Sequence, residues 1–245
     1  MRSGSNNLQD SLNDHPEIEC GGEVFNPRHL QIRGKVYRED QKAGAAQRVG
    51  LKAALVVARS GKRWCPEMML RIARRPVGRD MFGFRLFGEH VEVFGLNPVL
   101  EKLHVHGTKF IHLVRRDTFD QALSLVRAQA TGVWKITSKT PAAAAPLDLL
   151  SLAARVKSAA ELLHGHKVVT ARIARRYGAL LLDYDEYTRD ERSYDRIQDF
   201  LGVRSRVALR HSNVKTLPVD VALYRRLRDE LELSGAPMRF NPEAM

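Results

Sequence analysis

Residues 109–115 read KFIHLVR, a run of apolar and β-branched residues without Gly or Pro. Such a run is typical of a buried strand. Asp117 or Thr118 is placed to cap a helix directly after it, because both side chains accept hydrogen bonds from free backbone N–H groups. The apolar residues of that helix recur at helical spacing and direct one face toward a core: Phe119, Ala122, Leu123, Val126 and Ala130. The stretch predicts a strand followed by a helix, the repeating unit of an α/β fold.

The rest of the chain supports the same alternation. Further strands are predicted over 82–87 (FGFRLF) and 179–184 (ALLLDY), and helices over 7–12, 97–104, 147–163, 172–177, 194–201 and from Pro218 onward. Residues 36–75 are basic and mostly helical in pattern, 17–25 are predicted to be a connection, and 139–146 (KTPAAAAP) a loop. We therefore expect one domain over 1–245, a three-layer α/β sandwich with a central parallel sheet that binds ligands at the carboxyl ends of its strands.

The composition bounds the class of protein. The chain has 245 residues, 44% of them hydrophobic, which suffices for one sizeable core. It contains no apolar run of the roughly 18 residues that a membrane span needs, and its first residues are too polar for a signal peptide. Cys20 and Cys65 lie far apart without metal-type spacing. These features predict a reduced, cytoplasmic protein.

The formal net charge of +12 favours anionic partners. Nucleotides, nucleic acid, acidic glycans and a membrane surface all fit, and so does general solubility. The arginine groups at 71–75, 172–176 and 225–228 have no interleaved aromatics, which is more typical of solvated helix faces than of an RNA site. The alternate histidines at 104/106 and 164/166 lack a partnering Cys or carboxylate cluster, so we expect no metal site there.

A polar loop opens the chain and leads into the first predicted helix: Arg2-Ser3-Gly4-Ser5-Asn6-Asn7. Gly4 allows the backbone to approach an anion, and the amides of Ser5, Asn6 and Asn7 would be free donors at a helix N-terminus. Arg2 adds a charged fork for a phosphate or sulfonate. A flexible polar terminus would read similarly. The loop lacks the Gly-Lys-Ser/Thr of nucleotide-hydrolysing P-loops, which argues against an ATPase.

A second candidate anion site follows the strand at 109–115. Arg116 stands at its carboxyl end and Ser124 follows eight positions later. At 100° per residue, Ser124 falls away from the apolar face of its helix. An arginine at the end of a strand and a serine on the following helix can converge on one phosphate.

These motifs together resemble the bacterial carbohydrate sulfotransferases, especially the trehalose and nodulation-factor sulfotransferase group. The resemblance rests on RSGS at 2–5, on RD at 116–117 with QALS at 121–124, and on TGVW at 131–134; LDYDEY at 182–187 and DFLGV at 199–203 extend it weakly. It implies a P-loop nucleoside-triphosphate-hydrolase-like sulfotransferase fold. It also implies a donor, 3′-phosphoadenosine-5′-phosphosulfate (PAPS), and a carbohydrate or glycolipid hydroxyl as acceptor.

The resemblance also implies roles for particular residues. The opening loop, with Arg2, Gly4, Ser5 and Asn6, would bind the 5′-phosphosulfate, and Arg116 and Ser124 the 3′-phosphate. Lys215 or Arg210 corresponds loosely to a late basic residue near the nucleotide. Glu23 matches the family's general base, a group that the chemistry needs because an alcohol is a poor nucleophile until its proton is taken. Cationic side chains would replace a metal, and a homodimer is possible.

Two alternatives remain: a degenerate family member that binds an anionic partner without catalysis, and a basic nucleic-acid-binding protein. Phosphate loops of this kind normally follow a buried strand, and here only Met1 precedes Arg2. We therefore expect that strand to be encoded upstream of Met1.

Overall fold

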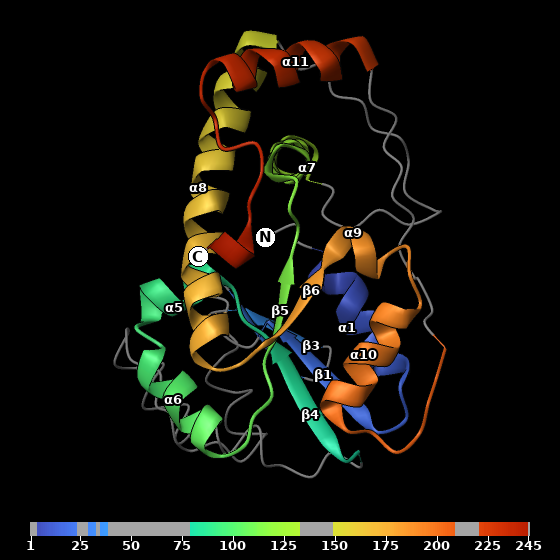
Figure 1. The fold of residues 1–245 in the computed structure, drawn as a ribbon. Helices are drawn as coiled ribbons and strands as arrows, with labels where there is room; N and C mark the ends of the chain where they lie inside the picture. The colour runs from blue at the N-terminus through green and yellow to red at the C-terminus, as the bar shows by residue number, and fades with distance from the viewer. Residues whose placement is uncertain are drawn as a thin grey trace. The chain divides into compact units, whose positions relative to one another are not determined.

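The computed structural model describes residues 4–23, 29–32, 35–38, 79–132, 149–208 and 221–244. They belong to two compact units (Figure 1). Unit 1 comprises Met1–Asn7, Ile111–Phe200 and Ala208–Met245, and unit 2 comprises Leu8–Phe110 and Leu201–Val207. The units are described separately below.

Two parallel strands lie side by side in unit 1. Strand β5 (Ile111–Val114) pairs with β6 (Leu180–Asp183), in a register that sets Ile111 opposite Leu180 and Val114 opposite Asp183. Both strands were predicted, and their parallel pairing is confirmed. A parallel pair needs a crossover connection, and the chain between these strands contains helices α7 (Thr118–Thr131) and α8 (Leu149–Arg176).

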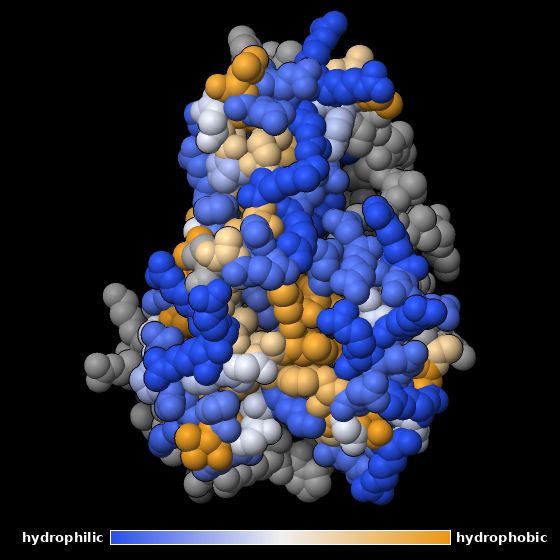
Figure 2. Space-filling view, in the orientation of Figure 1, coloured by the Kyte–Doolittle hydropathy of each residue, from blue (hydrophilic) through white to orange (hydrophobic). Residues whose placement is uncertain are grey.

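The main core of unit 1 lies between α7, α8 and α11 (Val221–Leu233). Four of the five predicted core positions of α7 are buried, but Ala130 is exposed and Ala128 is buried instead. Helix α8 contributes Leu152, Ala153, Val156 and Ala160 to this core, and α11 contributes Leu227 and Leu231. Polar and charged side chains cover much of the visible surface over these helices (Figure 2).

Helix α8 is a single helix of 28 residues. The prediction of two helices, ending near 163 and beginning again at 172, was therefore wrong. Gly165 and the β-branched residues at 168–170 lower the helix propensity of this part of the chain. Tertiary contacts outweigh that propensity, because Lys167 and Ala171 are buried and Thr170 accepts or donates a hydrogen bond with His112 at 3.1 Å.

Short elements also belong to the described part of unit 1. Helix α9 (Tyr184–Tyr187) follows β6 directly, α10 (Arg192–Leu201) ends at Gly202 as predicted, and the 3₁₀ helix η2 (Pro242–Ala244) lies near the C-terminus. The segment before η2 runs along the turn between β5 and α7. There Met238 accepts hydrogen bonds from the backbone N–H groups of Thr118 and Phe119, and Phe240 donates to the carbonyl of Arg116.

The described residues of unit 2 include four strands and two complete helices. Strand β1 (Ile18–Glu23) pairs in parallel with β4 (Met81–Arg85), and β2 (His29–Ile32) pairs antiparallel with β3 (Lys35–Arg38). Helices α5 (Gly88–Phe94) and α6 (Asn97–Val105) follow β4. Helix α1 (Ser5–Asp14) begins in unit 1 and continues here, where Asn13 Oδ1 accepts a hydrogen bond from Cys20 N at 2.7 Å.

Several predictions for this part of the chain need correction. The connection expected over 17–25 contains β1, and residues 36–38 of the expected helical segment belong to β3. Strand β1 was missed because it carries Gly21 and Gly22. A larger residue would not fit at position 21, however, because a Cβ there would lie 2.8 Å from the Phe82 ring of β4. The remainder of the helical prediction, like the loop expected over 139–146, lies outside the described residues.

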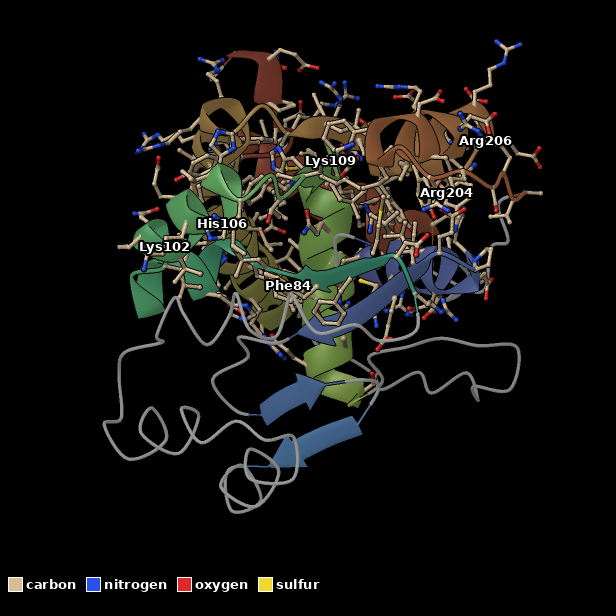
Figure 3. All side chains as sticks on the ribbon, turned by 90° about the horizontal axis from the view of Figure 1, so that it is seen from below. Phe84, Lys102, His106, Lys109, Arg204 and Arg206 are labelled. Carbon is tan, nitrogen blue, oxygen red and sulfur yellow. The ribbon has the colours of Figure 1, made fainter. Side chains whose placement is uncertain are left out.

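A charged contact joins distant parts of unit 2. The Glu17 carboxylate accepts hydrogen bonds from the backbone N–H groups of Arg204 (3.0 Å) and Ser205 (2.6 Å). These bonds lower the pKa of Glu17 to about 2. Lys109, labelled with Arg204 in Figure 3, donates from Nζ to the carbonyl of Leu201 at 3.0 Å. The segment after α10 is thereby held to the turn before β1.

The described strands form three two-stranded sheets in a mixed α/β structure. The predicted α/β class is confirmed at that level, and the central sheet of a three-layer sandwich stays a prediction. None of the helices in the described ranges combines the length and the apolar character that crossing a membrane requires.

Candidate functional site

Arg116 presents its guanidinium group at the carboxyl end of β5. Its Nε donates to Asp183 Oδ2 at 2.6 Å, and its two terminal nitrogens donate to the two carboxylate oxygens of Glu243 at 2.9 and 2.5 Å. The side chain remains 42% exposed. The hydrogen bonds to Glu243 raise the pKa of Arg116 and lower that of Glu243. Arg116 therefore forms a guanidinium fork that Asp183 orients and that engages the Glu243 carboxylate in bidentate geometry.

Asp183 fixes the orientation of this fork. It is the last residue of β6, and its side chain is 15% exposed. One carboxylate oxygen accepts from the backbone N–H groups of Asp185 and Glu186 and so caps α9, while the other accepts from Arg116. Because the cap immobilises the carboxylate, the guanidinium that it binds is also held in place.

The opening loop lies against the residue that follows Asp183. Gly4 has φ +86°, a conformation that only glycine adopts readily, and a Cβ added to it would lie 1.9 Å from Cε2 of Tyr184. The Gly4 carbonyl accepts from Asn7 N at 2.9 Å in the first turn of α1. Ser5, Asn6 and Asn7 form this turn, the N-terminal turn of α1.

Tyr184 links the two predicted halves of the site. It is buried, it contacts Gly4, and the guanidinium carbon of Arg115 lies 5.7 Å from its ring centroid. Asp183, its neighbour in the chain, binds Arg116. The opening loop thus contacts Tyr184, and Arg116 contacts its neighbour Asp183, at the carboxyl end of β6. Both contacts lie within unit 1.

Helix α7 begins at this edge as well. Asp117 is its N-cap, and its Oδ1 accepts from Asp120 N at 2.7 Å, as the sequence predicted. Asp120 in turn binds Arg115 (3.2 Å) and the hydroxyl of Tyr224 (2.7 Å). Ser124 lies half-buried on the same helix, in the same unit as Arg116.

Of the other predicted site residues, Glu23 belongs to unit 2 and four lie outside the described part of the chain. Glu23 is the last residue of β1, and its Cα pairs with that of Arg85 in β4 of unit 2. Arg2, Ser3, Lys215 and Arg210 lie outside the described residues. In the described part of the chain, no three His, Cys, Asp or Glu side chains are grouped as metal ligands.

Three residues at the site were not singled out by sequence reasoning: Asp183, Glu243 and Lys167. Asp183 had a usable signal, since it is a carboxylate directly after an apolar strand. Glu243 had none, because nothing in the terminal sequence indicates that it returns to β5. Lys167 is buried, and its Nζ donates to Arg115 O at 2.6 Å and to Thr118 Oγ1 at 2.8 Å. Burial lowers its pKa to about 8.

Comparison with known proteins agrees with the resemblance seen in the motifs. The family model described as Stf0 sulphotransferase matches residues 2–148, a segment that holds the opening loop, Glu23, Arg116 and Ser124. A search of curated proteins found no match.

Proposed function

Because the chain belongs to the Stf0 sulphotransferase family, we propose that it transfers the sulfuryl group of PAPS to a hydroxyl group of a carbohydrate or glycolipid. The observation that carries this proposal is the Arg116 fork, which binds a carboxylate through two parallel hydrogen bonds at a strand end. We further propose that residues 1–245 form one domain with the three-layer, P-loop-like fold.

Arg116 and Ser124 are the proposed ligands of the 3′-phosphate of PAPS, with Lys215 as a further cation. A phosphate dianion presents three strong acceptor oxygens, and the planar guanidinium matches two of them. The support is chemical: the donor set that holds Glu243 suits a phosphate at least as well. Asp183 would keep the fork oriented while the terminal nitrogens exchange Glu243 for phosphate.

The opening loop is the proposed cradle for the phosphosulfate end. Gly4, Ser5 and Asn6 would turn backbone N–H groups toward the ligand at the start of α1, and Arg2, Ser3 and Asn7 would add side-chain donors. These groups would stabilise negative charge on the sulfonate and on the leaving phosphate. The close approach of Gly4 to Tyr184 supports a loop of fixed shape.

Glu23 is the proposed general base. The acceptor hydroxyl attacks sulfur, the new S–O bond forms as the bond from sulfur to the 5′-phosphate oxygen breaks, and Glu23 takes the hydroxyl proton. The products are a sulfate ester and 3′-phosphoadenosine-5′-phosphate (PAP). PAP formation from PAPS with a panel of sugars and glycolipids tests this reaction. We expect Glu23→Gln to lower the rate at least about hundredfold, the range of general-base catalysis.

A chain that binds PAP but forms none from PAPS with any acceptor would instead be a degenerate member of the family. Salt-dependent binding to generic DNA or RNA that PAP does not compete with would favour the nucleic-acid alternative.

Glu243 should compete with the nucleotide for Arg116. Replacing it by glutamine removes a charge that must leave the fork before phosphate enters, and an exposed ion pair of this kind is weak, so the gain should be small. We therefore expect Glu243→Gln to bind PAP roughly two- to fivefold more tightly. Isothermal titration calorimetry measures the dissociation constant directly.

Glu232→Gln is the matched control, because Glu232 is an exposed glutamate at the end of α11 and the net charge changes equally. An equal gain in PAP affinity in both variants would show that the effect comes from the change in net charge alone. Unchanged or weaker binding in Glu243→Gln would contradict the competition.

A further inference from the structure

The buried ammonium group of Lys167 has no role in the proposed chemistry so far. It lies on α8, and both of its hydrogen-bond partners among the described residues are neutral: the carbonyl of Arg115 at 2.6 Å and the hydroxyl of Thr118 at 2.8 Å. Its third side is covered by Phe240, whose ring centroid lies 5.8 Å from Nζ. A buried charge held only by neutral groups is costly, so its presence needs an explanation.

The position of the group makes that cost larger. Thr118 is the first residue of α7, so the ammonium lies at the positive end of a helix dipole. Arg115, buried beside it, adds like-charge repulsion. A neutral donor would satisfy the same two oxygens without these penalties. The start of α7 also carries the carboxylates of Asp117, which favours the charged form of Lys167, and of Asp120, which binds Arg115, but the hydrogen bonds of the Lys167 ammonium go to neutral oxygens, so a nearby bound anion would stabilise it further.

The two partners of Lys167 are the two ends of the turn that carries Arg116. Arg115 O belongs to the peptide group that joins Arg115 to Arg116, and Thr118 begins the helix that bears Ser124. Lys167 thus orients the peptide plane directly before Arg116. The orienting hydrogen bonds and the positive charge of Lys167 both act on the turn that carries Arg116.

We propose that Lys167 is a positioning residue of the 3′-phosphate site, which clamps the turn from Arg115 to Thr118 and supplies, from behind it, positive charge that favours a bound phosphate. This inference rests on the proposed role of Arg116. It assigns to α8 a part in nucleotide binding that its sequence pattern did not indicate.

The clamp makes nucleotide binding sensitive to alkaline pH. The charged groups around Lys167 are Arg115 and Asp117 on the turn and His164 one turn earlier on α8, while the C-terminal segment presents the uncharged ring of Phe240. Burial lowers the pKa of Lys167 from 10.5 to about 8. The phosphates of PAP are already fully charged at this pH.

As the pH rises, the stability of the free protein should increase while its affinity for PAP decreases. Between about pH 8 and 10.5 the unfolded chain keeps a proton that folded Lys167 has lost. Stability rises with pH wherever the unfolded state binds more protons. Lys167 therefore contributes an increase in the free energy of unfolding over this window, while PAP affinity falls. A lysine that served folding alone would change the free energy of unfolding over this pH window but not the PAP affinity.

The test is calorimetric titration of the full chain with PAP at pH 7.5 and 9.5. We expect the wild-type dissociation constant to rise at least about fivefold, since the protonated fraction falls about tenfold per unit above the pKa. Lys167→Met should bind weakly at both values. Lys167→Arg keeps its charge, so it should bind nearly as tightly as wild type at pH 7.5 and lose the dependence on pH. Lys157→Met, on the same helix with an exposed bond to Ser234 O, is the control and should match wild type.

A measurement on the wild type alone guards against variants that fail to fold. Titration at pH 8.5 in buffers of different ionisation enthalpy should show uptake of a fraction of a proton as PAP binds. Tight binding by Lys167→Met, a pH dependence that persists in either Lys167 variant, or no proton uptake would overturn the inference. If the wild type binds no PAP at any pH, the proposed function itself fails, and the two failures are distinguishable.

Discussion

Arg116→Ala should weaken PAP binding at least about tenfold, because the variant loses a bidentate charge-assisted contact worth roughly 1.5–3 kcal/mol. PAP should also no longer raise the melting temperature of the variant measurably. The expected loss is large because the fork donates through both terminal nitrogens and is oriented by Asp183. Calorimetry gives the dissociation constant, and thermal unfolding with and without PAP gives the stabilisation.

Two further variants separate this effect from lost charge and lost stability. Arg116→Lys keeps the charge but not the planar fork, so its affinity should fall between those of wild type and Arg116→Ala. Arg155→Ala removes an exposed arginine on α8, about three turns before Lys167, and is the control. Its PAP affinity should be unchanged. An Arg116→Ala variant that is folded and binds PAP as wild type does would exclude Arg116 from the site.

Gly4→Ala should have the second large effect. The new Cβ would lie 1.9 Å from Cε2 of Tyr184, and the φ of +86° is unfavourable for any residue with a Cβ. Tyr184 is buried and cannot move away freely, so the opening loop must shift. We expect PAP affinity to fall at least about tenfold, with overpacking adding roughly 1–3 kcal/mol to the backbone strain.

Gly178→Ala is the matched control for this substitution. Gly178 precedes β6 in the same unit and has φ +60°, but a Cβ there would meet nothing within 4 Å. The control carries the backbone strain alone, about 1–2 kcal/mol, and should bind PAP normally. Equal effects of the two substitutions on PAP affinity would show that the contact between Gly4 and Tyr184 does not shape the site.

Local sequence pattern predicted unit 1 better than unit 2. Strands β5 and β6 are apolar runs with a clear helix cap after the first, so periodicity and the Asp117 signal sufficed. The continuity of α8 was missed because Lys167 and Thr170 are held by partners distant in sequence. Strand β1 was missed for a similar reason, since its two glycines suppress strand propensity while packing on Phe82 requires one of them.

Some residues of the candidate site could be predicted from local sequence, and others could not. Gly4 and Arg116 could be found because each lies in a motif whose chemistry is local. Asp183, Glu243 and Lys167 act through contacts that join β6, the C-terminus and α8 to one turn. No spacing rule within a single segment reveals such contacts, because tertiary folding creates them.

The most direct test of the central claim is a calorimetric titration of the full chain at pH 7.5 with PAP and, separately, with adenosine 5′-phosphate, which lacks the 3′-phosphate. A PAPS-dependent sulfotransferase with Arg116 at its 3′-phosphate site should bind PAP roughly 10- to 100-fold more tightly than adenosine 5′-phosphate, as expected for a bidentate charged contact. Equal affinity for the two nucleotides, or no binding of PAP, would contradict the account.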